Sequence, residues 1–432
     1  MSRAVGWRLV FPILVGKALR ALARVRGGGS AFPGWFVLKL APTFIESVTS
    51  QLSHGVVVVL GSNGKSTTTN MLTGIVRAHG LRVFTNPSGA NLPQGIASSL
   101  LGQVSLTGRL PHDIGVVEVD EAFGVVICQA LKPRAAVVLN VQIDQIYRLF
   151  EPERVAGMFR AIAGEVGETI VLNREDNFLS TLGDTLEAEG RLAVQWFGTA
   201  SQVLADAPHG QVLARDYAHE DVARPSREVL AEVTASRGTL AAISWKGRQH
   251  ELRLSARGLH NAVDAAGAIT LAAADLGDDF RIDTALTALE SLKTVYGRGE
   301  AITVGDRVVE ILLMKSLASL QMNLDALEAT PDSVLIAFDE HSRDPSWLYA
   351  ADLSALAHVD YVSGPKAVFI ALRLDYAGIP YDHVEPTIEK AVQAMLDGPR
   401  PASGRHTMLL DYDQMILARR HLGYRDLEAD AA

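Results

Sequence analysis

The sequence contains only one cysteine, Cys128, among 432 residues, and aromatic residues make up 6% of it. A single thiol excludes both a disulfide framework and a zinc site built from cysteines. This is typical of a reducing compartment, so we expect a cytoplasmic protein without zinc. Basic residues are also outnumbered, with 40 Lys and Arg against 49 Asp and Glu, so the net charge is −9. That balance argues against a general nucleic-acid binder, which needs a basic surface to release counterions.

The N-terminal stretch is as apolar as a membrane segment, but it contains several charged residues. A transmembrane helix needs about 20 residues with few charges, and a signal peptide needs an uninterrupted apolar core. Basic residues interrupt this stretch at Arg8, Lys17, Arg20 and Arg24. Apolar residues between them follow helical spacing, at Leu14, Ala18, Leu22 and Val25. Two interpretations stay open: an amphipathic helix packed on the body of the protein, or a basic helix in peripheral contact with the inner face of a membrane.

Apolar residues are abundant enough for a packed core. Hydrophobic residues make up 48% of the chain and charged residues 21%, which excludes disorder as the main state. A prior of about 150 residues per domain gives two to three domains. We expect an N-terminal amphipathic helix and connector over residues 1–50, a central domain over 51–293 and a C-terminal α/β domain over 294–432. Within the central domain, polar residues 199–256 predict a small antiparallel insertion without zinc.

Short apolar runs alternate with helical patterns along the central domain. Residues 56–60 are a continuous apolar run, as expected for a strand buried on both faces. Further strands are predicted at 81–85, 114–119, 135–139 and 169–172, with 333–338 as the clearest strand of the last domain. Helices are predicted at 65–79, 259–276 and 282–292, and a linker near 296–300. The alternation predicts an α/β fold with a doubly wound, mostly parallel sheet, followed by a smaller Rossmann-like unit.

The strand predicted at 56–60 leads into a glycine-containing loop and then a helix. The loop and first helical turn read Gly61-Ser62-Asn63-Gly64-Lys65-Ser66-Thr67. Small residues let backbone N–H groups approach phosphate oxygens, and the helix N-terminus adds positive potential. Lys65 can reach the terminal phosphates, and the Ser66 hydroxyl can bind Mg²⁺. We therefore predict a phosphate-binding loop, to which a plain strand–helix turn is the alternative.

A nucleotide bound with Mg²⁺ also needs an acidic group near its phosphates. The strand at 114–119 leads into a segment that carries Glu118, Asp120 and Glu121. Glu118 lies near the carboxyl end of the strand, where α/β sheets place their ligands. We predict that Glu118 binds Mg²⁺ directly or through water, and the alternative is a solvated acidic loop.

These residues resemble the motifs of the Mur ligase superfamily, whose phosphate loop reads Gly-Thr-Asn-Gly-Lys-Thr/Ser. Further segments resemble family motifs in order and spacing: Asn140 to Asp144, Leu172 to Asp176, Gly258 to Asn261 and Gly297 to Glu300. The resemblance implies a Mur-ligase-like central ATPase domain that uses ATP and Mg²⁺. It places Asn173, Asp176 and Asn261 near the nucleoside. Near the phosphates it places Gly61, Asn63, Gly64, Lys65, Ser66, Thr67 and Arg298.

Within the superfamily, the sequence is most similar to MurT, the ligase subunit of lipid II isoglutaminyl synthases. The similar segments include Thr85 to Leu92, Asp344 to Tyr349 and Ser363 to Ala367. Three departures concern the acceptor side. Residues 199–256 contain no cysteine for that subfamily's four-cysteine zinc ribbon, Lys315 to Ser319 replaces its Lys-Asn-Pro-Ala-Gly, and Ala350 replaces an acid.

The resemblance implies an ATP-dependent, ADP-forming carbon–nitrogen ligase of peptidoglycan biosynthesis. A substrate carboxylate would become an acyl phosphate, which ammonia or an amine would then attack. The expected carboxylate is the glutamate of the lipid II stem peptide, a lipid-linked substrate. Catalytic roles are implied for Lys65, Glu118, Asp144, Arg298 and Asp344, with Ser66 and Glu118 as the Mg²⁺ ligands.

The nitrogen source is expected to lie outside this chain. Glutamine hydrolysis normally uses an activated cysteine beside a histidine, and nothing around Cys128 suggests a nucleophile. We interpret Cys128 as a core residue. The resemblance implies a separate, GatD-like glutaminase subunit as the partner. Two alternatives stay open: a Mur-type ligase for another carboxylate in a specialised small-molecule pathway, and a non-catalytic nucleotide-binding scaffold.

Overall fold

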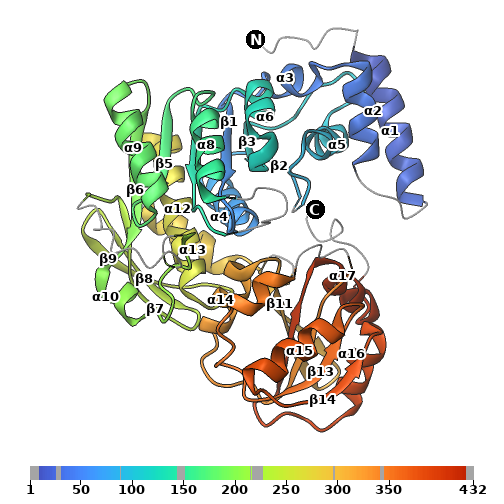
Figure 1. Cartoon of the computed structure of the whole chain (residues 1–432). Coiled ribbons are helices and arrows are strands. Elements are labelled where there is room, and N and C mark those ends of the chain that lie inside the picture. Colours follow the sequence, from blue (N-terminus) through green and yellow to red (C-terminus); the bar gives the residue numbers. More distant parts are fainter. Residues whose placement is uncertain are drawn as a thin grey trace.

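The computed structural model describes residues 9–25, 31–87, 89–143, 151–214, 216, 227–294, 297–340 and 345–424. These residues form two sheets, a nine-stranded one in the first two thirds of the sequence and a six-stranded one after it (Figure 1). Both sheets are covered by helices, which confirms the predicted α/β class. No helix in the described part of the chain is long and apolar enough to cross a bilayer.

The first sheet has the strand order β2-β3-β1-β4-β5-β6-β7-β8-β9 and is parallel from β2 to β7. Its strands are β1 (Val56–Leu60), β2 (Val83–Thr85), β3 (Ile114–Glu118), β4 (Ala135–Val138), β5 (Thr169–Asn173), β6 (Ala193–Thr199), β7 (Ala231–Arg237), β8 (Leu240–Trp245) and β9 (Arg248–Arg253). β1 lies between β3 and β4, with Val59 beside Glu118 and Leu60 beside Val138. The carboxyl ends of β1, β3 and β4 therefore meet at one edge of the sheet, where the phosphate loop begins.

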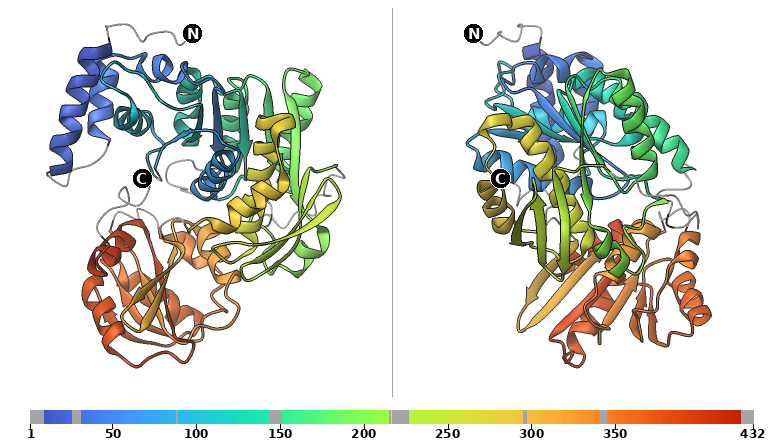
Figure 2. Two further views of the ribbon diagram at one scale, coloured as in Figure 1. Left: turned by 180° about the vertical axis from the view of Figure 1, so that it is seen from behind. Right: turned by 90° about the vertical axis from the view of Figure 1, so that its left-hand side faces the viewer.

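Helices bury both faces of this sheet, which explains why its central strands are apolar throughout (Figure 2). One face is covered by α1 (Val10–Val25), α2 (Phe32–Leu40), α3 (Phe44–Thr49), α5 (Pro93–Gln103), α6 (Gly124–Leu131), α8 (Pro152–Ala163) and α9 (Asn177–Glu189). The other is covered by α4 (Lys65–Ala78), α12 (Leu259–Leu276) and α13 (Ile282–Ser291).

The antiparallel strands predicted within 199–256 are β7, β8 and β9, and they extend the first sheet rather than form a sheet of their own. β7 pairs in parallel with β6, because the short helix α10 (Ser201–Asp206) leads the chain into a crossover. The hairpins then continue the sheet in antiparallel fashion to its edge. Alternating residues of β8 are buried against α12 and α13, so this edge belongs to the same core as the central strands.

The second sheet has the order β10-β11-β15-β12-β13-β14, parallel except for the β10–β11 hairpin. Its strands are β10 (Arg298–Val304), β11 (Arg307–Leu313), β12 (Val334–Ala337), β13 (Val359–Ser363), β14 (Tyr381–Glu385) and β15 (Arg405–Leu410). The helices packed on it are α14 (Leu317–Asp325), α15 (Ala367–Ala377), α16 (Ile388–Asp397) and α17 (Tyr412–His421). Arg298, which the sequence placed in a linker, is the first residue of β10.

Candidate functional site

A glycine ends the loop after β1 and makes the turn into α4. Gly64 precedes the first residue of α4 and has a φ of +84°, in the left-handed region that favours glycine. A Cβ atom at Gly64 would also overlap the Asp264 carboxylate on α12. Glycine is therefore needed at position 64 for two reasons, the left-handed turn and the close approach of α12.

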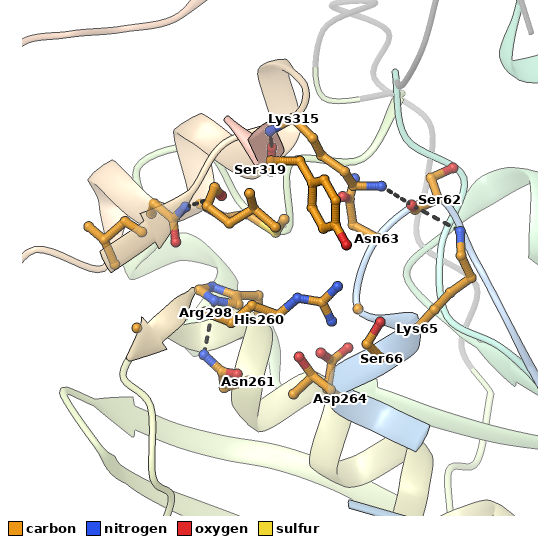
Figure 3. Close-up of a pocket in the computed structure, with 18 of the residues that line it drawn as sticks. Ser62, Asn63, Lys65, Ser66, His260, Asn261, Asp264, Arg298, Lys315 and Ser319 are labelled. Carbon is orange, nitrogen blue, oxygen red and sulfur yellow. Dashed lines mark hydrogen bonds between the residues drawn. The ribbon is translucent and has the colours of Figure 1, made fainter. Parts of the chain in front are cut away.

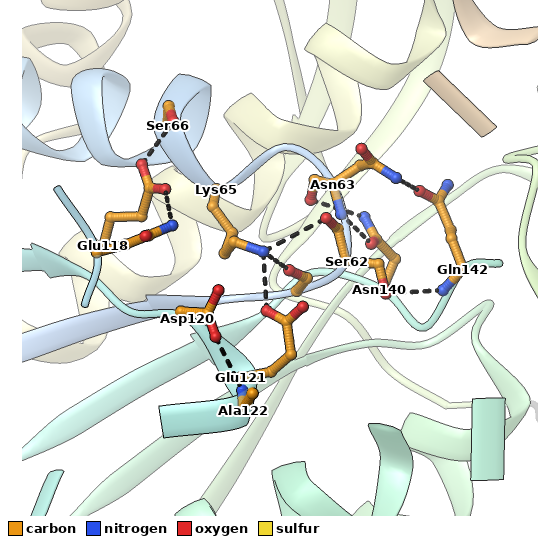
Figure 4. Close-up of polar contacts among 12 residues, drawn as sticks. Ser62, Asn63, Lys65, Ser66, Glu118, Asp120, Glu121, Ala122, Asn140 and Gln142 are labelled. Atoms are coloured by element: carbon orange, nitrogen blue, oxygen red, sulfur yellow. Dashed lines mark hydrogen bonds and ion pairs between the residues drawn. The ribbon is translucent and has the colours of Figure 1, made fainter. Parts of the chain in front are cut away.

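Side chains from the segment after β4 hold this loop in place. The Asn63 backbone N–H donates to Asn140 Oδ1 (3.0 Å), and Asn140 Nδ2 donates to the Asn63 carbonyl (3.2 Å). Asn63 Nδ2 donates to Gln142 Oε1 (2.7 Å), and the Gln142 backbone N–H donates to Ser62 Oγ (3.0 Å) (Figure 4). These hydrogen bonds hold the loop on the segment after β4.

Lys65 lies beneath the loop and pairs with an acid that the sequence analysis did not select. Its Nζ donates to the Gly61 carbonyl (2.5 Å) and to Glu121 Oε2 (3.0 Å) (Figure 4). The side chains of Lys65 and Glu121 are 9% and 2% exposed, so the ion pair is buried. Burial acts to raise the pKa of Glu121, but the neighbouring Lys65 ammonium and hydrogen bonds outweigh it and hold that pKa below its usual value. The Glu121 carboxylate is therefore ionised at neutral pH.

Ser66 and Glu118 form the acidic side of the site. Ser66 Oγ lies 2.5 Å from Glu118 Oε2, and Asn91 Nδ2 donates to Glu118 Oε1 (2.9 Å). Asn86 fixes the Glu118 backbone through both of its groups, at 2.9 and 3.0 Å. A carboxylate and a hydroxyl oxygen this close together are the hard donors that Mg²⁺ prefers. The residues present therefore fit the predicted metal.

Two cations, one from β10 and one from the connection between β11 and α14, complete the site. Lys315 Nζ donates to the Ser62 carbonyl (3.1 Å), across a sequence distance of 253 residues. Arg298 extends from the start of β10 toward Ser66 and Lys65 (Figure 3). Its Nη1 is buried and has no hydrogen-bond partner within the described residues. Burial lowers the pKa of Arg298, while the nearby Glu118 and Asp264 oppose that shift.

These groups line a cavity of about 350 Å³ between the two sheets. Its walls include Lys65, Ser66, Glu118, Arg298 and Lys315. Three cationic side chains thus converge with a carboxylate–hydroxyl pair at a helix N-terminus. Such an arrangement suits a polyphosphate accompanied by a divalent cation.

His260 and Asn261 form the wall of this cavity that adjoins a second one. Asn261 Nδ2 contacts His260 Nε2 (2.9 Å) and donates to the Arg257 carbonyl (2.8 Å) (Figure 3). Burial lowers the pKa of His260 to about 4, so its ring is neutral at neutral pH. The second cavity, of about 390 Å³, shares Asn63, Gly64 and His260 with the first. A nucleotide bound at the loop could extend into either space.

Asn173 and Asp176, which the resemblance places near the nucleoside, are buried in the supporting structure. Asp176 caps α9 by accepting from Phe178 and Leu179, and its other oxygen accepts from the Val141 backbone N–H (2.6 Å). Asn173 Nδ2 donates to the Leu139 carbonyl (3.0 Å). Neither residue is among those that line the two cavities in the described part of the chain. They position the segment after β4, which in turn holds the loop.

The other predicted residues divide into two groups. Asn63, Gly64, Thr67 and Asn261 line the first cavity with the residues above, while Gly61 contributes its carbonyl to Lys65. Asp144 and Asp344 lie outside the described residues. Among the participants missed as site residues are Glu121, Asp264 and Lys315. Glu121 and Lys315 stand in segments that the sequence had already marked, but nothing in the sequence showed which groups they meet.

Comparison with known proteins agrees with this geometry. Residues 59–272 match the Mur ligase middle domain family. Over 94% of the chain and 97% of the relative, the sequence is 27% identical to the lipid II isoglutaminyl synthase (glutamine-hydrolyzing) subunit MurT of Streptococcus pneumoniae. It is 25% identical to the MurT subunit of Staphylococcus aureus strain COL, over 89% of the chain and 91% of the relative.

Solved structures show the same fold. A MurF structure from Acinetobacter baumannii superposes with a TM-score of 0.66 and 15% identity, over 91% of this chain and 80% of that one. The MurF ligase of Thermotoga maritima in complex with ADP superposes with a TM-score of 0.65 and 18% identity, over 93% and 85% of the two chains.

Proposed function

Because residues 59–272 make this chain a member of the Mur ligase superfamily, we propose that it is an ATP-dependent, ADP-forming carbon–nitrogen ligase. The observation that carries the proposal is the convergence of Lys65, Lys315 and Arg298 on the Ser66–Glu118 pair. Positively charged groups around a metal-binding acid are what phosphoryl transfer requires, since catalysis there is mainly positioning and charge neutralisation.

Each group has a role in this reaction. Lys65 and Arg298 bind the β- and γ-phosphates, and Lys315 reaches the same region from the second sheet. Ser66 and Glu118 hold Mg²⁺, which when bound neutralises phosphate charge. Arg298 suits this role because one of its buried nitrogens has no other hydrogen-bond partner within the described residues. Asp144 is proposed to lie near the acyl phosphate.

The chemistry takes place in two steps. An oxygen of the substrate carboxylate attacks the γ-phosphorus of ATP, the bond to the β-phosphate oxygen breaks, and ADP leaves. The product is an acyl phosphate. Ammonia then attacks the acyl carbon, loses a proton, and expels inorganic phosphate to leave an amide. We expect the two sheets to close around this intermediate, because Lys315 and Arg298 come from one and the loop from the other.

The substrate that we propose is the stem-peptide glutamate of lipid II. The support is the relation to MurT subunits over nearly the whole length of both chains. Those relatives are named as subunits of a glutamine-hydrolysing enzyme, so we also propose a GatD-like glutaminase partner. Asp344 is the residue that we expect nearest to that partner.

Cys128 supports an external source of ammonia. It is the only cysteine in the sequence, and its side chain is buried in the core between α6 and its neighbours. Burial raises the pKa of its thiol to about 12, the opposite of the activation that a nucleophilic cysteine needs. Glutamine hydrolysis by this thiol is therefore not expected.

The test is phosphate release by the purified chain with ATP, Mg²⁺ and ammonium, against lipid II and a panel of soluble carboxylates. We expect turnover with lipid II, retention of that turnover when glutamine and a glutaminase replace ammonium, and its loss in Arg298→Met. Turnover restricted to a small soluble acid would refute the substrate. ATP binding without turnover under every condition would refute the ligase activity itself.

One alternative substrate class has support of its own. Residues 199–256 lack cysteines, and Lys315 to Ser319 departs from the MurT motif, so the acceptor side differs from that subfamily. A Mur-type ligase acting on another carboxylate in a small-molecule pathway would have the same phosphate site. The carboxylate panel distinguishes the two.

A further inference from the structure

We propose that the N-terminal helix pair, α1 and α2, binds the surface of an anionic phospholipid bilayer. The two helices lie side by side at the outer edge of the first sheet, at the end remote from β7 to β9 (Figures 1 and 2). The proposal concerns where the protein is held and does not depend on which carboxylate it activates.

The outward face of α1 is apolar. Its exposed residues among 10–23 are Phe11, Leu14, Ala18, Ala21 and Leu22. The spacing of these positions places them on one stripe of the helix. The three large side chains, Phe11, Leu14 and Leu22, are 66%, 46% and 56% exposed. A helix on the surface of a globular protein normally presents its polar face to water. Here the exposed face of α1 is apolar instead.

The second helix adds aromatic residues to this apolar surface. Phe32, Trp35 and Leu40 of α2 are 54%, 49% and 44% exposed, and the rings of Phe32 and Trp35 stack with their centroids 6.0 Å apart. Lys39 Nζ lies 5.7 Å from the centroid of the Trp35 ring. An exposed tryptophan beside a lysine is suited to a membrane interface, where an apolar ring and a charged group meet lipid and headgroup together.

The apolar stripe cannot turn inward, because the opposite face of the pair is already packed. A Cβ atom at Gly16 would overlap Val37 of α2, and one at Gly34 would overlap the Gln94 carbonyl of α5. The Gly34 backbone N–H donates to Ser98 Oγ (3.2 Å), and Arg20 Nη1 donates to the Ser98 carbonyl (3.0 Å). These contacts hold the helix pair rigidly on α5 and leave Phe11, Leu14 and Leu22 directed away from it.

The charge of residues 1–40 indicates which kind of surface the helix pair binds. Residues 1–40 carry seven Lys and Arg and no Asp or Glu, a charge of +7. Since the whole chain carries −9, the remaining residues carry −16. A segment with an apolar stripe whose charged residues are all basic matches an anionic bilayer, which attracts basic groups near its surface. The same face of a second copy would bring two such positive segments together, which disfavours a symmetric dimer through this surface.

The helix pair would lie on the membrane rather than cross it. α1 has 16 residues, which at 1.5 Å per residue extends about 24 Å, less than a bilayer core. Its apolar side chains would enter the boundary between headgroups and acyl chains, and Lys17 and Lys39 would stay among the headgroups.

The experiment is co-sedimentation of the full chain with vesicles of phosphatidylcholine alone and with about 30% phosphatidylglycerol. We expect binding to the anionic vesicles that weakens with salt, and at least about tenfold weaker binding to the neutral ones. The triple variant Phe11→Ser/Leu14→Ser/Leu22→Ser should bind anionic vesicles at least about tenfold more weakly.

Matched controls separate this surface from general effects of the substitutions. Leu106 and Val126 are 55% and 61% exposed but lie outside the helix pair, so Leu106→Ser/Val126→Ser should bind like the parent chain. Lys39→Glu should weaken binding, whereas Lys390→Glu, on the exposed side of α16, should not. Since all these side chains are exposed, thermal unfolding should stay unchanged in each variant, which verifies folding without reference to lipid.

Several results would overturn the proposal. They are equal binding to neutral and anionic vesicles, binding unaffected by the triple variant, or no binding to anionic vesicles. A concentration-dependent dimer that the triple variant abolishes would assign the surface to a second copy instead. None of these readouts involves turnover, so failure of the ligase proposal would leave the result interpretable.

Discussion

Because Lys65 and Glu121 form a buried ion pair, substitutions of Lys65 should lower the stability of the fold as well as the ligase activity. Lys65→Met removes the ammonium that we propose binds phosphate, and we expect it to abolish ligase turnover. It also leaves Glu121, whose side chain is 2% exposed, without its cation. The fold should be destabilised as well, because that carboxylate is then buried without a counter-charge.

The magnitude follows from the geometry. Two unit charges 3.0 Å apart interact by about 5–6 kcal/mol at an effective dielectric constant of about 20. Removing one partner of a buried pair costs about 3–5 kcal/mol, because the other charge stays desolvated. Replacing both residues with uncharged side chains of similar shape should change the free energy of unfolding little. We therefore expect Lys65→Met and Glu121→Gln each to lose about 3 kcal/mol, and the double variant to regain most of that loss.

Urea unfolding of the parent, both single variants and the double variant measures this directly as a double-mutant cycle. Phosphate release on the same samples separates the two roles, since the double variant should be stable yet inactive. Single variants that each lose less than about 1 kcal/mol would refute the buried pair. A double variant that is as unstable as the sum of the singles would also refute it.

Three further predictions concern other parts of the site and core. Lys315→Met should weaken ATP binding by about tenfold or more in calorimetry without changing stability, because a charge-assisted contact contributes about 1.5–3 kcal/mol; unchanged affinity would remove Lys315 from the site. Gly64→Ala should destabilise by about 2–4 kcal/mol through its φ of +84° and its overlap with Asp264, whereas Gly80→Ala, with a φ of +89° and open space around it, should lose only about 1 kcal/mol; equal losses would contradict the overlap. Burial raises the pKa of Asp275 to about 6, so the native state keeps a proton that the unfolded chain releases near pH 4. The protonated carboxyl therefore leaves the free energy of unfolding at its full value below pH 4, and part of that free energy is lost as pH rises through 6. Asp275→Asn should therefore gain up to about 3 kcal/mol in urea unfolding at pH 7.5 and little at pH 4, and a gain independent of pH would contradict the titration.

The strands and the loop of the first sheet were predictable because their signals are local. The run Val56–Leu60 is apolar throughout and forms β1 with those bounds, and α4 begins at Lys65 as predicted. A buried strand, a glycine turn and a helix start are each set by backbone preferences within a few residues. Residues 199–256 were predicted to form a small antiparallel insertion, and their antiparallel strands extend the first sheet. Alternation of apolar residues predicts strands, but it does not say which sheet they join.

The site residues divide in the same way. Ser66 and Glu118 were predicted together, and the structure brings them within 2.5 Å, because β1 and β3 are neighbours and both end at the same edge. The resemblance places Asp176 near the nucleoside, and in the structure its oxygens cap α9 and accept from the Val141 backbone N–H. An Asp before a helix is consistent with either role, since capping and ligand binding use the same oxygens.

By itself, then, the sequence predicted the phosphate loop, the acid beside it and the α/β class. It also showed that the chain has no cysteine besides Cys128. All of these depend on residue type and on order along a short stretch of chain. Only the tertiary structure decided that Glu121 neutralises Lys65, that Lys315 reaches Ser62 across 253 residues, and that the N-terminal helix pair presents its apolar stripe outward. Those facts depend on how whole sheets and helices pack, and packing distances between remote segments are set by the complete core rather than by any local pattern.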